Sequence, residues 1–204
     1  MRLVCWVAAA AMMGCSGAAV NEEVVFSEKF QDELAEGWHW LREQPEDWRL
    51  QDGGLELRAR PGDAHTVTTA LLHPAPSLAE GPLIFEVTVT FLDELTEQFE
   101  QAGLTWYDDG EPVFKLVHEL VDGEMMIIPG RALTESQTVT LRLLVSEGHY
   151  EAQYREEGEE AFHTVDAGEL STGTDSHISL LTYHGPEDAE HWVRFTDFRV
   201  LRAN

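Results

Sequence analysis

The stretch QAGLTWYDDGEPVFKLVHELVDGEMMII, which runs from Gln101 to Ile128, contains three strand-like segments and the two turns between them. Apolar residues recur within the segments with a period of two, which is the period of a β-strand. The separators are Asp108-Asp109-Gly110 and Asp122-Gly123, where glycine accommodates the positive φ of a tight turn. The stretch therefore predicts an antiparallel β-meander.

The same pattern extends over most of the chain. Only two short acidic segments, 32–36 and 93–100, have the composition of a helical turn. Because the strands do not alternate with helices, we expect one all-β domain over residues 24–204, a jelly-roll sandwich of two antiparallel sheets. The predicted strands are Val24–Phe30, Trp48–Gln51, Gly54–Ala59, Thr66–His73, Leu83–Leu92, Gln101–Tyr107, Val113–Leu120, Glu124–Ile128, Thr138–Glu147, Tyr150–Arg155, Phe162–Ala167, His177–His184 and Trp192–Arg202.

The charge of the chain argues against one class of partner. The 204 residues include 38 acidic and 13 basic side chains, which give a formal net charge of −25 at pH 7. Duplex binding depends on basic groups that neutralise phosphates, so nucleic acid is not an expected partner. The same charge disfavours docking on anionic lipid. We expect the protein to be a monomer.

The first residues have the pattern of a targeting segment. A basic start, Met1-Arg2, precedes the uncharged run Leu3–Met13, which is too short to span a hydrocarbon core of about 30 Å. The run ends at a glycine followed by Cys15, an arrangement similar to a bacterial lipobox. We therefore expect residues 1–14 to be a lipoprotein signal peptide, Cys15 to be lipidated, and 15–23 to form a flexible tether.

These features predict an exported protein that is lipid-anchored on the periplasmic or cell-surface side of a bacterial membrane. Contact with the membrane would run only through the N-terminal lipid. Cys5 would leave with the signal peptide, so an intrachain disulfide is not expected. Plain secretion after cleavage at another position is the alternative.

Segments spread along the chain carry a family resemblance. They are mostly core and turn positions: Phe26–Phe30, Trp38–Pro45, Trp48–Leu50, Gly54–Arg58, Leu71–Pro74, Phe85–Phe91, Gln101–Asp108, Phe114–Leu116 and Val193–Val200. In order and spacing they resemble the concanavalin A-like domain at the C-terminus of family-43 β-xylosidases, and also the lectin-like family named regulation of enolase protein 1. The resemblance covers nearly all of residues 24–204. It implies a concanavalin A-like jelly roll that binds oligo- or polysaccharide without catalysis.

Aromatic side chains give the most specific functional indication. Sugars present flat C–H faces edged by hydroxyls, so a carbohydrate site needs an aromatic platform beside charged or amide groups. Strand alternation, together with positions carried over from the family, predicts a groove on the concave face that contains Trp40, Arg42, Glu43, Trp106, Lys115, Glu119 and Tyr183. The alternative for the tryptophans is burial at the ends of the sandwich.

Two further functions stay open. A glycoside hydrolase or lyase would use carboxylates that flank the sugar, for which Glu28, Glu43, Glu86 and Glu119 are the candidates. A structural or partner-binding envelope protein would need neither a sugar site nor a carboxylate pair.

A structural calcium ion is the cofactor candidate. Calcium prefers oxygen ligands, and jelly-roll modules often use one to tie the N-terminal segment to the last strand. Glu28 and Asp197 are the nearest equivalents here. A zinc site within 184–191 is a weaker alternative, because the histidines and acids there lack the compact spacing of structural zinc sites.

Overall fold

The computed structural model describes residues 22–203. The predicted signal peptide, the lipidation site Cys15 and most of the predicted tether lie outside the described residues. Strand β1 begins at Glu22, two residues before the predicted start of the domain at Val24. Among the described residues, no helix has the length and apolar character needed to cross a membrane.

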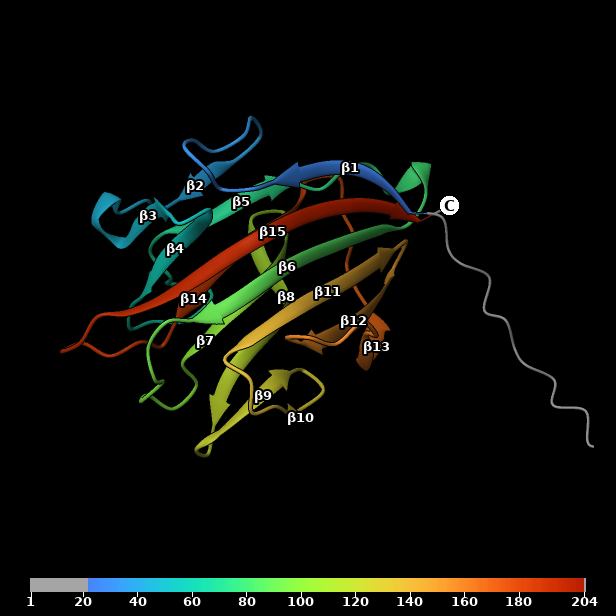
Figure 1. The fold of residues 1–204 in the computed structure, drawn as a ribbon. Helices are drawn as coiled ribbons and strands as arrows, with labels where there is room; N and C mark the ends of the chain where they lie inside the picture. The colour runs from blue at the N-terminus through green and yellow to red at the C-terminus, as the bar shows by residue number, and fades with distance from the viewer. Residues whose placement is uncertain (1–21, 204) are drawn as a thin grey trace, which may run out of the picture.

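The described residues form two antiparallel sheets that face each other (Figure 1). The larger sheet has the order β13 (His163–Glu169), β12 (His149–Glu156), β11 (Thr138–Ser146), β6 (Leu83–Phe91), β15 (His191–Ala203), β4 (Gly54–Ala59) and β3 (Trp48–Gln51). Its eighth strand, β1 (Glu22–Glu28), pairs with the second half of β15, and β4 pairs with the first half.

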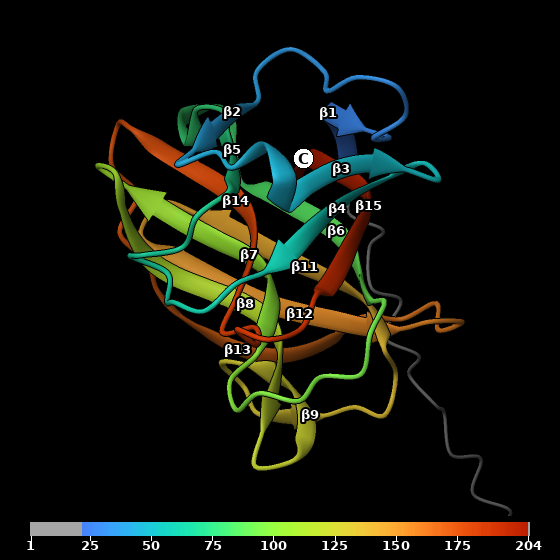
Figure 2. The same cartoon turned by 90° about the vertical axis from the view of Figure 1, so that its left-hand side faces the viewer.

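The smaller sheet has seven strands. Their order is β10 (Ala132–Leu133), β9 (Glu124–Ile128), β8 (Glu111–Val121), β7 (Gln101–Asp108), β14 (Ser176–Tyr183), β5 (Ala70–Pro74) and β2 (His39–Leu41). A view from the side separates β7, β8 and β14 from the layer that contains β4, β6 and β15 (Figure 2). The prediction of an all-β jelly-roll sandwich of two antiparallel sheets is confirmed.

The differences from the predicted elements are local. Strands β2 and β10 were not predicted, because runs of three and two residues carry no readable periodicity. The acidic segments 32–36 and 93–100 are bends and loops rather than helical turns. The two short 3-10 turns lie instead at Pro45–Asp47 and Leu78–Glu80.

Three Asp-Gly pairs make the tight turns that the sequence predicts. Both residues have positive φ in each pair: 53° and 72° at Asp52-Gly53, 50° and 81° at Asp109-Gly110, and 54° and 82° at Asp122-Gly123. Two consecutive positive φ angles are the mark of the type I′ hairpin turn, whose twist matches that of the flanking strands. The register of the meander around β8 is therefore specified locally.

The hydrophobic core fills the space between the sheets. β7 contributes Ala102, Leu104 and Trp106, and these meet inward-facing residues of the larger sheet such as Phe85. A second, smaller apolar cluster lies on the other face of the smaller sheet, around Val67 and Tyr183. The smaller sheet is thus covered on both faces over part of its area, and this determines where a ligand could reach it.

Candidate functional site

Trp106 lies inside the core. Its exposed fraction is 0%, its ring packs edge-on against Phe85 with the centroids 5.7 Å apart, and its indole N–H donates to the Ser171 carbonyl oxygen at 3.0 Å. The prediction that Trp106 offers a platform to a sugar is wrong. The alternation along β7 was assigned correctly, but the face that carries Trp106 is the one turned toward the larger sheet.

Trp40 and Glu43 are also directed away from the predicted groove. Trp40 is the cross-strand neighbour of the fully buried Leu71, so it points toward the interior, where its ring lies 4.7 Å from that of Trp48. The Glu43 carboxylate accepts a hydrogen bond from the Trp48 indole N–H at 3.0 Å. Lys115 lies on the opposite face, so the groove that joins it to Trp40 does not exist.

Lys115, Glu119 and Tyr183 do share the outer face of the smaller sheet. The Lys115 ammonium donates to the Glu119 carboxylate at 2.9 Å and to the side-chain carbonyl oxygen of Gln101 at 2.7 Å. Tyr183 is the cross-strand neighbour of Gln101 and is 4% exposed. Burial, and then the charge of Glu119, raise the pKa of the Tyr183 hydroxyl, so it stays neutral at physiological pH.

A loop covers part of this outer face. Residues 60–69 place Val67 in the apolar cluster that contains Tyr183, and the Tyr107 hydroxyl donates to the Ala64 carbonyl oxygen at 3.2 Å. The Arg42 guanidinium donates to the Val67 carbonyl oxygen at 2.6 Å. Arg42 therefore holds this loop in place, a structural contact that strand alternation does not reveal.

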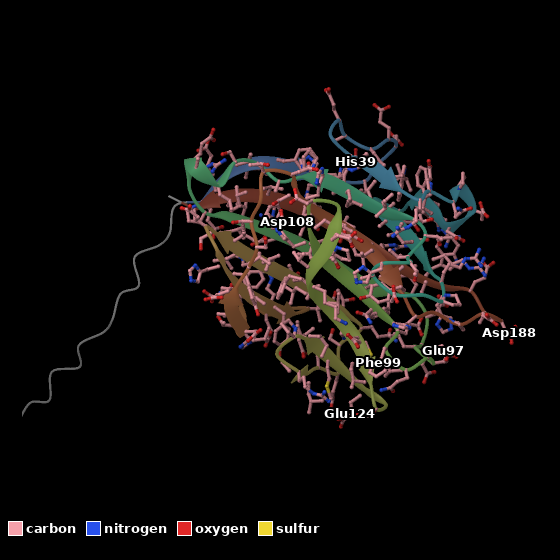
Figure 3. The ribbon with its side chains drawn as sticks, turned by 180° about the vertical axis from the view of Figure 1, so that it is seen from behind. His39, Glu97, Phe99, Asp108, Glu124 and Asp188 are labelled. Atoms are coloured by element: carbon pink, nitrogen blue, oxygen red, sulfur yellow. The ribbon has the colours of Figure 1, made fainter. Side chains whose placement is uncertain are left out.

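A pocket of about 350 Å³ remains between the loop and β8. It begins where β9 stops pairing: β9 pairs with β8 only over Val117–Val121, so residues 111–116 have no partner strand on that side in the described part of the chain. Its lining is mostly apolar and consists of Ala64, Thr105, Pro112, Val113, Phe114, Lys115, Ile128, Pro129 and Tyr150. Figure 3 shows this side of the molecule, with Asp108 labelled at the end of β7 and Phe99 labelled in the loop that precedes it.

Two polar residues of this region were missed as site residues. Thr105 is the cross-strand neighbour of Lys115, and its buried hydroxyl has no hydrogen-bond partner. Gln101 binds the Lys115 ammonium. The period of two already places Gln101, Thr105 and Tyr107 on one face of β7, and that signal would have found them.

The four candidate acids for hydrolysis are separated. Glu86 lies on the outer face of the larger sheet, where it contacts Arg142 and Arg199, and Glu119 lies on the outer face of the smaller sheet. Glu28 and Glu43 are engaged elsewhere by hydrogen bonds. Glycoside hydrolysis needs two carboxylates that face each other across the sugar, and these four form no such pair.

The predicted calcium ligands do not fit a cation. One Glu28 carboxylate oxygen accepts hydrogen bonds from the backbone N–H groups of Lys29 at 2.7 Å and Phe30 at 2.8 Å. The other oxygen accepts from the backbone N–H of Ala35 at 2.7 Å and from the indole N–H of Trp38 at 3.2 Å. A carboxylate surrounded by four N–H donors has no lone pair directed at a metal ion. Asp197 is occupied by the Lys29 ammonium at 2.5 Å.

Two side chains of the acidic segment 184–191 have partners on other parts of the chain. His191 pairs with Glu100 at 2.7 Å, and Glu190 pairs with Arg58 at 2.9 Å. Within residues 22–203, no three or more His, Cys, Asp or Glu side chains are grouped as a metal site.

Comparisons with known proteins place the fold. No family model and no curated protein sequence matches the chain. The GH43 protein BlXynB from Bacillus licheniformis has a TM-score of 0.71 at 16% identity over 86% of this chain and 39% of its own. The xylan β-1,4-xylosidase from Bacillus halodurans C-125 has a TM-score of 0.69 at 19% identity, over 85% of this chain and 38% of its own.

A shorter protein matches over almost its full length. A functionally unknown protein from Saccharomyces cerevisiae has a TM-score of 0.61 at 15% identity, over 82% of this chain and 97% of its own. The chain spans less than two-fifths of the two Bacillus proteins, and at these identities the likeness concerns the fold alone. The chain therefore has the concanavalin A-like jelly-roll fold that is present in these GH43 xylosidase structures.

Proposed function

We propose that this chain is a non-catalytic, lectin-like domain that binds oligo- or polysaccharide on the outer face of the smaller sheet. One observation carries the proposal: the Gln101–Lys115–Glu119 hydrogen-bond network borders a mostly apolar pocket on an otherwise covered face. Directed polar groups beside apolar walls are the combination that a sugar ring needs. The fold shared with GH43 structures agrees with this, and the separation of the candidate carboxylates argues against hydrolysis.

Binding should depend on Lys115. We expect Lys115→Met to weaken binding of xylo-oligosaccharides about tenfold or more, because a hydrogen bond from a charged group to the ligand is lost. Xylo-oligosaccharides are the first probe because a structure of similar fold is that of a xylan xylosidase. Isothermal titration calorimetry measures the effect.

Lys29→Met is the matched control. It removes the same charge from an exposed lysine that pairs with Asp197, away from the smaller sheet. We expect it to leave binding unchanged, and circular dichroism checks that both variants are folded. Equal loss of binding in the two variants would point to a non-specific charge effect and contradict the proposed site.

The anchoring at Cys15 is part of the proposal. Lipidation would hold the domain at a bacterial membrane, and the net charge of −25 would keep the tethered domain off anionic lipid. Cys15→Ala is expected to move the protein from the membrane fraction to the soluble fraction when the protein is produced in a bacterium that processes lipoproteins. Retention of the variant in the membrane fraction would contradict the lipid anchor.

A partner-binding role is the second candidate. The open edge of β8 at residues 111–116 favours it, because an unpaired strand edge can accept a strand from another protein. A photo-crosslinker at Val113, which is 46% exposed, tests this candidate in cells. One defined cross-linked protein, with no sugar bound across an oligosaccharide panel, would favour it over the lectin-like role.

A further inference from the structure

The polar groups that face the pocket have hydrogen bonds left to donate. An ammonium has three N–H bonds, and Lys115 uses two of them, toward Gln101 and Glu119. The Thr105 hydroxyl beneath it is buried and has no partner. A buried hydroxyl without a partner is costly, so Thr105 is a position where an incoming acceptor would be favoured.

The rest of the pocket suits a small apolar group. Val113 and Ile128 line it with aliphatic side chains, and Pro112 and Pro129 add ring carbons. The volume of about 350 Å³ leaves room for more than a methyl group. Such walls favour an acceptor that is attached to an apolar group over a ring edge that carries only hydroxyls.

Acidic side chains lie beside residues that line the pocket. Glu119 lies 2.9 Å from the ammonium of the pocket-lining Lys115, and Glu111 begins the strand that forms the pocket wall. The one ammonium nearby, on Lys115, is already paired with Glu119. A carboxylate on the ligand would be repelled by this field, so the acceptor should be neutral.

We infer that the pocket receives the acetyl group of a neutral, acetylated sugar. The methyl group packs against Val113 and Ile128, and the carbonyl oxygen accepts hydrogen bonds from the Thr105 hydroxyl and the free N–H of Lys115. Thr105 and Lys115 both line the pocket, and the side chain of Lys115 is 35% exposed. This inference rests on the proposed carbohydrate-binding function and names its ligand class.

The test compares pairs of ligands of which one member carries acetyl groups and the other does not. Acetylated xylo-oligosaccharides are titrated into the protein beside the same preparation after mild alkaline deacetylation. Chito-oligosaccharides and cello-oligosaccharides form a second pair, which differs at the acetamido group. We expect the acetylated member to bind at least about fivefold tighter, as one or two added hydrogen bonds would give.

Variants of Thr105 locate the effect. Thr105→Val should bring the ratio of affinities close to one, and Thr105→Ser should restore the ratio. Thr88→Val is the control, because it removes a threonine hydroxyl that bonds to Thr140 on the larger sheet. Magnetisation transfer from the acetyl methyl group to the methyl groups of Val113 and Ile128 is expected in NMR spectra.

The outcomes separate the two ideas. Equal binding of acetylated and deacetylated ligands overturns the acetyl pocket and leaves the lectin-like function standing. A preference for acetylation that survives Thr105→Val in folded protein places the acetyl group elsewhere and also overturns the inference. Binding of neither member of either pair overturns the proposed function itself, and the inference with it.

Discussion

Replacing Trp106 with alanine is expected to lower the free energy of unfolding by about 3–5 kcal/mol, as is typical of large aromatic residues removed from a core. The ring is fully buried against Phe85, and its loss leaves a cavity between the sheets. The hydrogen bond that holds the Ser171 carbonyl is lost as well. Urea unfolding followed by circular dichroism measures the change.

Two substitutions sharpen this prediction. Trp106→Phe keeps most of the buried area and should cost clearly less than Trp106→Ala. Trp40→Ala, which removes a half-buried tryptophan at the edge of the core, should also cost less. A destabilisation below about 1 kcal/mol in Trp106→Ala would mean that the ring is not a core element. If Trp106→Ala were destabilised that little and also lost sugar binding, direct contact between Trp106 and the ligand would be the explanation.

Replacing His118 with leucine is expected to make the domain more resistant to acid. His118 is fully buried beside Phe91, both of its ring nitrogens lack partners, and burial lowers its pKa from 6.5 to about 3. Between those values the unfolded chain binds a proton that the folded chain does not. Stability is therefore fully present above pH 6.5 and falls as the pH drops, by about 1.4 kcal/mol per pH unit for this group.

Urea unfolding at pH 7.0 and 4.5 measures this effect. Between pH 6.5 and pH 4.5, the free energy of unfolding of the wild type should fall by about 2.7 kcal/mol more than that of His118→Leu. His65→Leu is the control, because His65 is exposed beside Glu111. At pH 7 the leucine should be neutral or stabilising, because it removes two buried polar atoms without partners. Parallel pH profiles for wild type and His118→Leu would contradict the prediction.

The sequence is sufficient for the strands and their turns because both are determined locally. An Asp-Gly pair adopts two positive φ angles with little regard to its surroundings, so the turn at Asp122-Gly123 could be predicted from the two residues alone. In β11 the period of two in the sequence matches the structure, because buried and half-buried residues alternate over the whole strand. Strands of fewer than four residues, such as β2, carry too little pattern to be recognised.

The face on which each residue lies was predicted less well than the strands themselves. Alternation states that Trp106 and Thr105 point to opposite faces of β7, but it does not state which face meets the larger sheet. Every residue of β7 is buried, and residues 60–69 cover part of its outer face, where the Tyr107 hydroxyl donates to the Ala64 carbonyl oxygen. Burial on both faces removes the polar contrast from which orientation is normally inferred.

What the sequence by itself determined is the all-β class and the approximate positions of most strands, because the period of two and the turn residues are local properties. Only the tertiary structure decided that Trp40 points inward, that Arg42 holds a covering loop, and that Lys115 and Thr105 border a pocket. Each of these depends on strands and loops that are distant in sequence and meet through long-range pairing and packing. Such contacts have no local signature, and so the fold decided which of the candidate residues lie together at one site.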